Sequence, residues 1–99
     1  MQKSLNDILP AEYEEIKNLA ALFFTPREIA MMMSLPSGDF VFACEREGTP
    51  AYEAFQGGRL QSEVDHRTSV IKLAKSGSSP AQTMVNDLIA KSKIQMLNK

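Results

Sequence analysis

A hydroxyl residue stands directly before proline at three places in this chain: Thr25-Pro26, Thr49-Pro50 and Ser79-Pro80. At the start of a helix, the hydroxyl oxygen can accept a hydrogen bond from a free amide, and proline at the first helical position loses no bond. Each pair therefore predicts a helix start. Thr25 is followed three residues later by Glu28, which predicts a full capping box.

Apolar spacing between these starts predicts five helices and no sheet. The expected ranges are residues 10–24, 26–33, 37–46, 49–76 and a last helix from residue 80. The apolar side chains of the first range recur at helical spacing: Tyr13, Ile16, Ala20 and Phe23. Pro36 and Gly48 separate the third helix from its neighbours. The predicted fold class is all-α, with an N-terminal helix-turn-helix-like module of three helices followed by a long helical hairpin.

The two last helices are long for a chain of 99 residues, and their apolar stripe exceeds what one small module can cover. We therefore expect residues 1–48 to form the module and residues 49–99 to form a hairpin that joins copies into a homo-oligomer. The residues expected to make these contacts are Leu60, Val64, Ile71, Met84 and Leu88. Alternatively, both helices fold back onto the first three.

Gly57 and Gly58 lie inside the predicted long helix, where each costs about 1 kcal/mol relative to alanine. A kink, a break into two helices or a close helix contact would explain them. Methionine packs adaptably against variable partners. In the run Met31-Met32-Met33, Met33 is expected in the core, and Met31 or Met32 can face a partner.

The formal charge of −1 hides two halves of opposite sign. Residues 1–48 carry four basic and eight acidic side chains, a net charge of −4, and residues 49–99 carry seven basic and four acidic ones, a net charge of +3. This balance argues against a protein that holds nucleic acid mainly through a basic field. The acidic half of one copy could meet the basic half of another, or both could be solvated faces.

Residues 25–46 have the spacing of a helix-turn-helix. Ile29 is followed by the small residue Ala30, and the inward apolar positions after them are Met33, Leu35 and Phe40. Two short helices that cross steeply need a small residue at the contact and apolar plugs around the turn. Any compact helical domain also places apolar residues at helical spacing, so both interpretations stay open.

The DNA-binding residues expected within this motif are Arg27, Ser37 and Arg46. Lys72 and Lys75, with Lys91 and Lys93, are alternative phosphate contacts if DNA runs along the hairpin instead. The second helix of the motif is a poor reader of base edges, because Asp39 and Glu45 would repel the DNA backbone and only Arg46 could pair with a phosphate or a guanine. Phe42, if exposed, suits a protein contact. Binding to double-stranded DNA would then be weak and would depend on many copies.

The chain resembles a known family, the small terminase subunits of tailed bacteriophages and prophages. The resemblance covers roughly residues 20–92 and rests on residues 24–30, Phe40, Ala51-Tyr52, Gly58-Arg59, residues 73–78 and Pro80-Ala81. It implies an N-terminal module that engages packaging-initiation DNA and a hairpin that assembles a ring. The ring would recruit the large terminase subunit, which carries the ATPase and nuclease.

The sequence contains little that would indicate a catalytic or metal-binding site. His66 and Asp65 are adjacent, hence about 100° apart on a helix, and Cys44 lies on an apolar face. We therefore expect no enzyme activity, no cofactor and no metal. No apolar run of membrane-spanning length and no signal segment is present, so we expect a cytoplasmic protein with no membrane partner. The alternatives to a small terminase subunit are an interaction adaptor that never touches DNA and a small transcription regulator.

Overall fold

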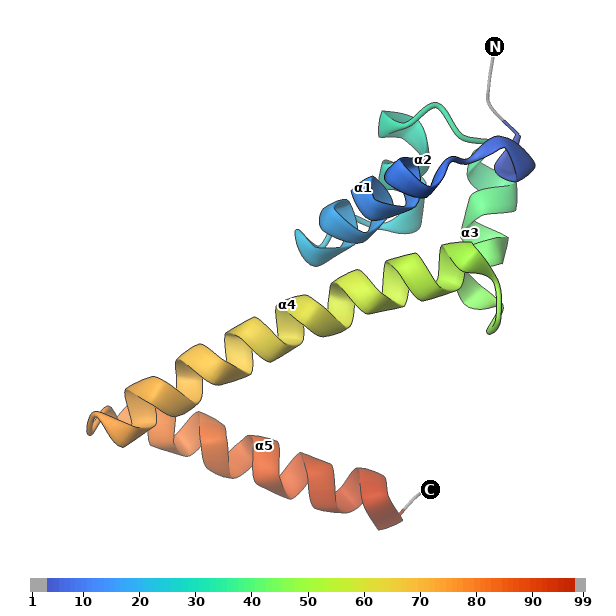
Figure 1. Cartoon of the computed structure of the whole chain (residues 1–99). Coiled ribbons are helices and arrows are strands. Elements are labelled where there is room, and N and C mark those ends of the chain that lie inside the picture. The colour runs from blue at the N-terminus through green and yellow to red at the C-terminus, as the bar shows by residue number, and fades with distance from the viewer. Residues whose placement is uncertain (1–3, 98–99) are drawn as a thin grey trace. The chain divides into compact units, whose positions relative to one another are not determined.

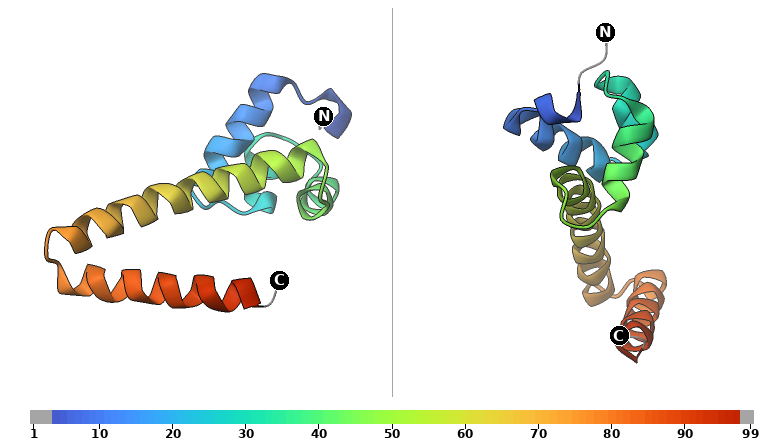
Figure 2. Two further views of the ribbon diagram at one scale, coloured as in Figure 1. Left: turned by 60° about the horizontal axis from the view of Figure 1, so that its bottom comes forward. Right: turned by 90° about the vertical axis from the view of Figure 1, so that its right-hand side faces the viewer.

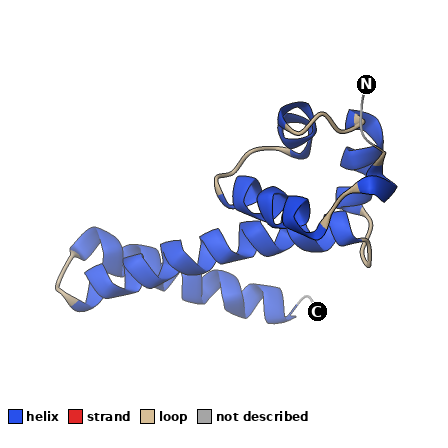
Figure 3. Cartoon of the chain, turned by 45° about the horizontal axis from the view of Figure 1, so that its top comes forward, coloured by secondary structure: helices blue, strands red, loops and turns tan. Residues whose placement is uncertain are grey.

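The computed structural model describes residues 4–97, and within that range all regular structure is helical (Figures 1 and 3). A short 3-10 helix, η1 (Leu5–Asp7), precedes five α-helices. These are α1 (Pro10–Ala21), α2 (Pro26–Met32), α3 (Ser37–Glu45), α4 (Pro50–Lys75) and α5 (Ser79–Leu97). The all-α prediction is confirmed.

The contacts within the chain divide it into two units, and the boundary lies inside α4, between Ser62 and Glu63. The first unit contains η1, α1, α2, α3 and the first turns of α4. The second contains the last turns of α4 and all of α5. The assignment of separate roles to residues 1–48 and 49–99 concerns function and stays a prediction.

One apolar cluster forms the core of the first unit, and each of its α-helices contributes to it. Its buried members are Ile16 and Ala20 of α1, Ile29 and Ala30 of α2, Leu35 of the following turn, Phe40 and Cys44 of α3, and Ala51 and Phe55 of α4. Phe40, Ile16 and Ile29 are completely buried. A shared core therefore stabilises the helices of this unit, and α1, α2 and α3 depend on it because each of them alone is too short to be stable in water.

The prediction that the first helix reaches Phe24 is wrong, because α1 ends at Ala21. Phe23 takes a positive φ of 70°, its amide donates to the Ala20 carbonyl, and the Phe24 amide donates to the Leu19 carbonyl. This is the hydrogen-bond pattern of a Schellman motif, which usually has glycine at the positive-φ position. A phenylalanine there is strained locally and needs support from the rest of the fold.

Arg59 supplies that support from α4. Its guanidinium donates hydrogen bonds to the carbonyl oxygens of Phe24 at 3.0 Å and Phe23 at 3.4 Å. The same group lies over the rings of Phe55, at 4.8 Å, and Phe23, at 5.5 Å. Arg59 thus holds the chain between α1 and α2 against α4 by hydrogen bonds and cation–π contacts.

Gly58 brings α4 close to α1. A Cβ atom at this position would overlap the Lys17 carbonyl oxygen and lie 2.9 Å from Ala20 Cβ. At Gly57 a Cβ atom would meet nothing within 4 Å. The sequence left a kink, a break into two helices or a close helix contact as explanations for this glycine pair. The structure shows a close helix contact at Gly58. Helix α4 continues through both glycines, so it does not break there.

Two of the three expected helix caps are present. Thr25 Oγ1 accepts from the Glu28 amide at 3.2 Å while Glu28 Oε1 accepts from the Thr25 amide at 2.9 Å, which completes the capping box. The pKa of Glu28 is lowered, first because the Thr25 amide donates to its carboxylate and second because the Thr25 hydroxyl also hydrogen-bonds to it. Thr49 Oγ1 accepts from the Tyr52 amide at the start of α4.

The prediction that Ser79 caps the last helix is wrong. Helix α5 begins at Ser79, and the cap is Ser78, whose hydroxyl accepts from the Ala81 amide at 3.3 Å. The reason is the end of α4, where Gly77 has a positive φ of 100° and the Ser78 amide donates to the Leu73 carbonyl. Because Gly77 already reverses the chain, Ser78 is the next residue free to cap a helix.

In the second unit, the last turns of α4 and the helix α5 are joined by the short turn at Ser76–Ser78 (Figure 2). Val70 of α4 and Ala81 of α5 are its buried apolar residues. Gln82 Nε2 donates to the Ala74 carbonyl at 3.1 Å, which ties the first turns of α5 to the end of α4.

Candidate nucleic-acid and assembly surfaces

The segment from α2 to α3 buries the apolar residues that the spacing predicted to point inward. Ile29, Ala30 and Phe40 are fully buried, Leu35 is almost so, and Met33 packs against the core with partial exposure. Helix α2 ends with Ser34 at a φ of 58°, and the Leu35 amide donates to the Ala30 carbonyl at 2.8 Å. The turn therefore places the Leu35 side chain in the core, between the two helices.

Three of the expected DNA-binding residues belong to this segment. Arg27 is exposed in the first turn of α2, Ser37 is the first residue of α3 and partly buried, and Arg46 is the exposed residue that follows the end of α3. Ser37 and Arg46 are nine residues apart, which is about 13 Å along a helix. The structure places Ser37 and Arg46 at opposite ends of α3 instead of in one cluster.

The exposed face of α3 is acidic and apolar. Its solvent-facing residues are Gly38, Asp39, Phe42 and Glu45. The Arg46 guanidinium lies over the Phe42 ring at 5.4 Å from its centroid. Arg46 is therefore engaged with an exposed aromatic ring, and the rest of this face presents carboxylates that would repel phosphate.

Lys72 and Lys75, the other two expected DNA-binding residues, lie in the last turn of α4 within the second unit. Both are exposed. Lysines in the last turn also interact favourably with the negative end of the helix dipole, so their position has a structural explanation as well.

An apolar groove runs between α4 and α5 in the second unit. We call it the α4–α5 groove, and it has a volume of about 350 Å³. Its lining residues are Arg67, Ile71, Val85, Leu88, Ile89, Ser92 and Lys93. Four aliphatic side chains form the groove and two cationic side chains border it. Arg67 also pairs with Glu63 at 3.3 Å, one helical turn earlier.

The groove includes Ile71 and Leu88, two of the five residues predicted to join copies. Val64 and Met84, also in the second unit, are exposed but do not line it, and Leu60 is exposed on the part of α4 that belongs to the first unit. The sequence prediction did not include Val85 and Ile89. Their i, i+4 spacing on α5 was the signal for a shared helix face.

A second apolar hollow, on α2, belongs to the first unit. We call it the α2 patch, and it is lined by Phe24, Glu28, Met31 and Met32 with a volume of about 210 Å³. Met31 and Met32 are both exposed. Exposed apolar side chains grouped beside a carboxylate are typical of a protein contact.

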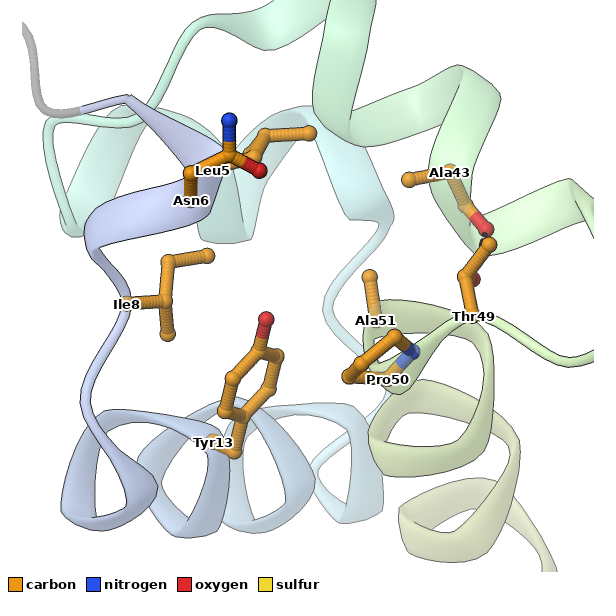
Figure 4. Close-up of a pocket in the computed structure, with 8 residues that line it drawn as sticks. All are labelled: Leu5, Asn6, Ile8, Tyr13, Ala43, Thr49, Pro50 and Ala51. Atoms are coloured by element: carbon orange, nitrogen blue, oxygen red, sulfur yellow. Dashed lines mark hydrogen bonds between the residues drawn. The ribbon is translucent and has the colours of Figure 1, made fainter.

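A third hollow of about 350 Å³ lies in the first unit, where η1 and α1 face the end of α3 and the start of α4. Figure 4 shows Tyr13 projecting into it, between Ile8 and Ala51. On its far side the Thr49 hydroxyl donates to the Ala43 carbonyl at 2.7 Å. The hollow lacks converging charged groups, since all eight lining residues are uncharged.

The single cysteine, Cys44, is buried and is not activated as a nucleophile. Burial raises the pKa of the Cys44 thiol to about 12, and the nearby Glu45 carboxylate adds to the shift. At neutral pH such a thiol is almost entirely protonated and unreactive. Among residues 4–97, no three or more histidine, cysteine or acidic side chains are grouped in a way that could hold a metal ion.

The helices of the described range lack the sustained apolar length that a bilayer crossing requires. In comparisons with protein-family models, with curated proteins and with solved structures, no match to this chain was found.

Proposed function

We propose that this protein is the small terminase subunit of a phage or prophage, a non-enzymatic component that recognises DNA and assembles into an oligomer for packaging. The observation that supports this most is the α2–turn–α3 segment. Its small residue, Ala30, and its turn plug, Leu35, are both buried, as a helix-turn-helix needs. In the order expected from the resemblance, two long helices follow.

The charges indicate how such a protein would hold DNA. The exposed face of α3 presents Asp39 and Glu45, so direct reading of bases by this helix is disfavoured. Lys72 and Lys75 are exposed on a unit that carries six basic and three acidic side chains. Phosphate contacts would therefore come mainly from the second unit of several copies, with Arg27 as a further contact.

A gel-shift experiment with double-stranded DNA at low and moderate salt tests this proposal. Two double variants remove the same charge from the two surfaces: Lys72→Gln with Lys75→Gln, and Arg27→Gln with Arg46→Gln. We expect a wild-type complex, and we expect the lysine pair to lower the slope of log affinity against log salt by about 2 per bound copy. The arginine pair should have a smaller effect, because Arg46 is engaged with Phe42.

A larger loss with the arginine pair would move DNA contact back to the first unit. Absence of any shift at low salt would contradict DNA binding. A large ATPase–nuclease encoded in a neighbouring reading frame would supply the second partner, and co-purification of the two proteins would test recruitment.

The second candidate function is an adaptor that binds protein through the α2–α3 segment. The observation that favours it is the exposed Phe42 ring under Arg46 on an otherwise acidic face. Such an aromatic and arginine pair is frequent at the centre of protein interfaces. A negative gel shift combined with capture of a purified protein partner, lost on Phe42→Ala, would favour this function.

A further inference from the structure

The two apolar hollows described above have opposite charge surroundings. The α4–α5 groove is bordered by Arg67 and Lys93, and the α2 patch contains Glu28. The net charges of the two units that carry these hollows also have opposite signs. Residues 1–62 hold five basic and nine acidic side chains, a net charge of −4, and residues 63–99 hold six basic and three acidic ones, a net charge of +3.

We infer that the α4–α5 groove of one copy holds the α2 patch of a second copy. The exposed Met31 and Met32 side chains would enter the apolar groove between α4 and α5, and the acidic first unit would face the basic border of the groove. Methionine suits this role because its flexible thioether side chain adapts to an irregular surface. Complementary charge around an apolar contact selects this pairing over others.

The same charges argue against the groove of one copy facing the groove of another. In that symmetric arrangement the cationic borders of the two grooves would be brought together, and like charges across an interface are costly. Lys93 would contribute most to this cost, because Arg67 is paired with Glu63. A contact between two different surfaces has a distinct consequence. Each copy keeps one free patch and one free groove, so copies add head to tail into a ring or an open chain.

This inference rests on the assembly part of the proposed function and names the partner of the groove. It does not require DNA binding. The contact is small, because α2 has only seven residues, so association should depend on protein concentration.

Mass measurement by light scattering on the full chain, over a range of concentrations, tests the pairing. Met31→Lys alters the patch and Ile89→Lys alters the groove, and both introduce a positive charge so that the altered surfaces repel each other. Met96→Lys is the control for the patch, because Met96 is 72% exposed and Met31 is 71% exposed. Leu73→Lys is the control for the groove, since Leu73 is 56% exposed and Ile89 is 49% exposed, and Leu73 does not line the groove.

We expect the wild type and both controls to give a mass several-fold that of the 11.0 kDa chain at high concentration. Each of Met31→Lys and Ile89→Lys alone should give the mass of one chain. An equimolar mixture of these two variants should give the mass of two chains. In the mixture, the intact groove of the Met31→Lys chain can hold the intact patch of the Ile89→Lys chain, and growth stops there. Circular dichroism should show the same helix content in all five proteins.

Three results would overturn the inference. If Met31→Lys assembles like the wild type, the groove holds something other than the patch. If the two single variants dissociate but their mixture stays monomeric, the surfaces do not pair with each other. If the wild type is monomeric at every concentration, assembly itself fails. Only this last result also contradicts the oligomer of the proposed function, and the gel shift tests DNA binding separately.

Discussion

The two units of this chain are both helical, but they cover their apolar surface to different extents. In the first unit, nine buried residues form one cluster to which four helices and a turn contribute. In the described part of the second unit, only Val70 and Ala81 are buried apolar residues. Its exposed large apolar side chains are Val64, Ile71, Leu73, Met84, Ile89, Ile94, Met96 and Leu97. Helices of similar composition can thus bury many of their apolar side chains or leave most of them exposed, depending on how many neighbouring helices pack against them.

The largest effect that would separate the two units is expected from truncating their buried side chains. Phe40→Ala removes a fully buried ring from the first unit and should lower its free energy of unfolding by about 3–5 kcal/mol. Val70→Ala in the second unit removes two methyl-sized groups and should cost only about 1.5 kcal/mol. Urea unfolding followed by circular dichroism measures both. Equal losses would mean that the second unit has a core as demanding as the first.

A second test concerns the close approach of α1 and α4 in the first unit. Gly58→Ala should destabilise the protein by about 1–3 kcal/mol, because the new methyl group overlaps the Lys17 carbonyl and Ala20. Gly57→Ala should stabilise it by about 0.5–1 kcal/mol, because the site is open and alanine favours helix. Thermal unfolding midpoints of the two variants should move in opposite directions. Movement in the same direction would refute the close contact.

The smallest effect compares one helix cap from each unit. Thr25→Ala should cost about 1 kcal/mol, because it breaks a capping box, and Ser78→Ala should cost about 0.5 kcal/mol, because that cap is a single bond of 3.3 Å. Denaturant midpoints of the two variants measure this difference. A larger loss of stability for Ser78→Ala than for Thr25→Ala would contradict the expected ranking of the two caps.

The capping box also has a pH signature. The pKa of Glu28 is lowered in the folded state, so its contribution to stability is present above its ordinary pKa and is lost as pH falls through the lowered value. NMR titration of the Glu28 carboxyl in Thr25→Ala should show its pKa moving part of the way back up, because the hydrogen bond from the Thr25 hydroxyl is lost while the backbone amide at position 25 still donates. An unchanged midpoint would show that the Thr25 hydroxyl does not lower this pKa.

Local signals in the sequence predicted the local features of the fold. The capping box at Thr25 and Glu28, and the cap at Thr49, involve residues three apart, and a pattern can predict such contacts. The inward positions Ile29, Leu35 and Phe40 follow from spacing as well. These features depend on few residues and little on the rest of the molecule.

The cap at Ser78 was missed although its cause, the adjacent Gly77, is local, but the other features that were missed depend on residues far apart in the chain. Phe23 ends α1 with a positive φ because Arg59, on α4, hydrogen-bonds to its carbonyl and packs over its ring. Val64 and Val70 are the same residue type on one helix, yet Val64 is exposed and Val70 is buried. Which of them finds a neighbour is a property of tertiary packing that helix periodicity does not contain. The same holds for the groove, which exists only because α5 lies beside the end of α4.

Cys44 has a practical consequence for studying these surfaces. Its thiol is buried, with Sγ facing the Ala51 carbonyl at 4.0 Å, and its pKa of about 12 keeps it protonated. A maleimide label should therefore ignore it in the folded protein and react with a cysteine introduced at an exposed site. Fluorophores could then be placed on either unit without removing the native residue, and energy transfer between two labels would report the distance between the units in solution. Labelling of Cys44 itself would signal that the first unit has opened.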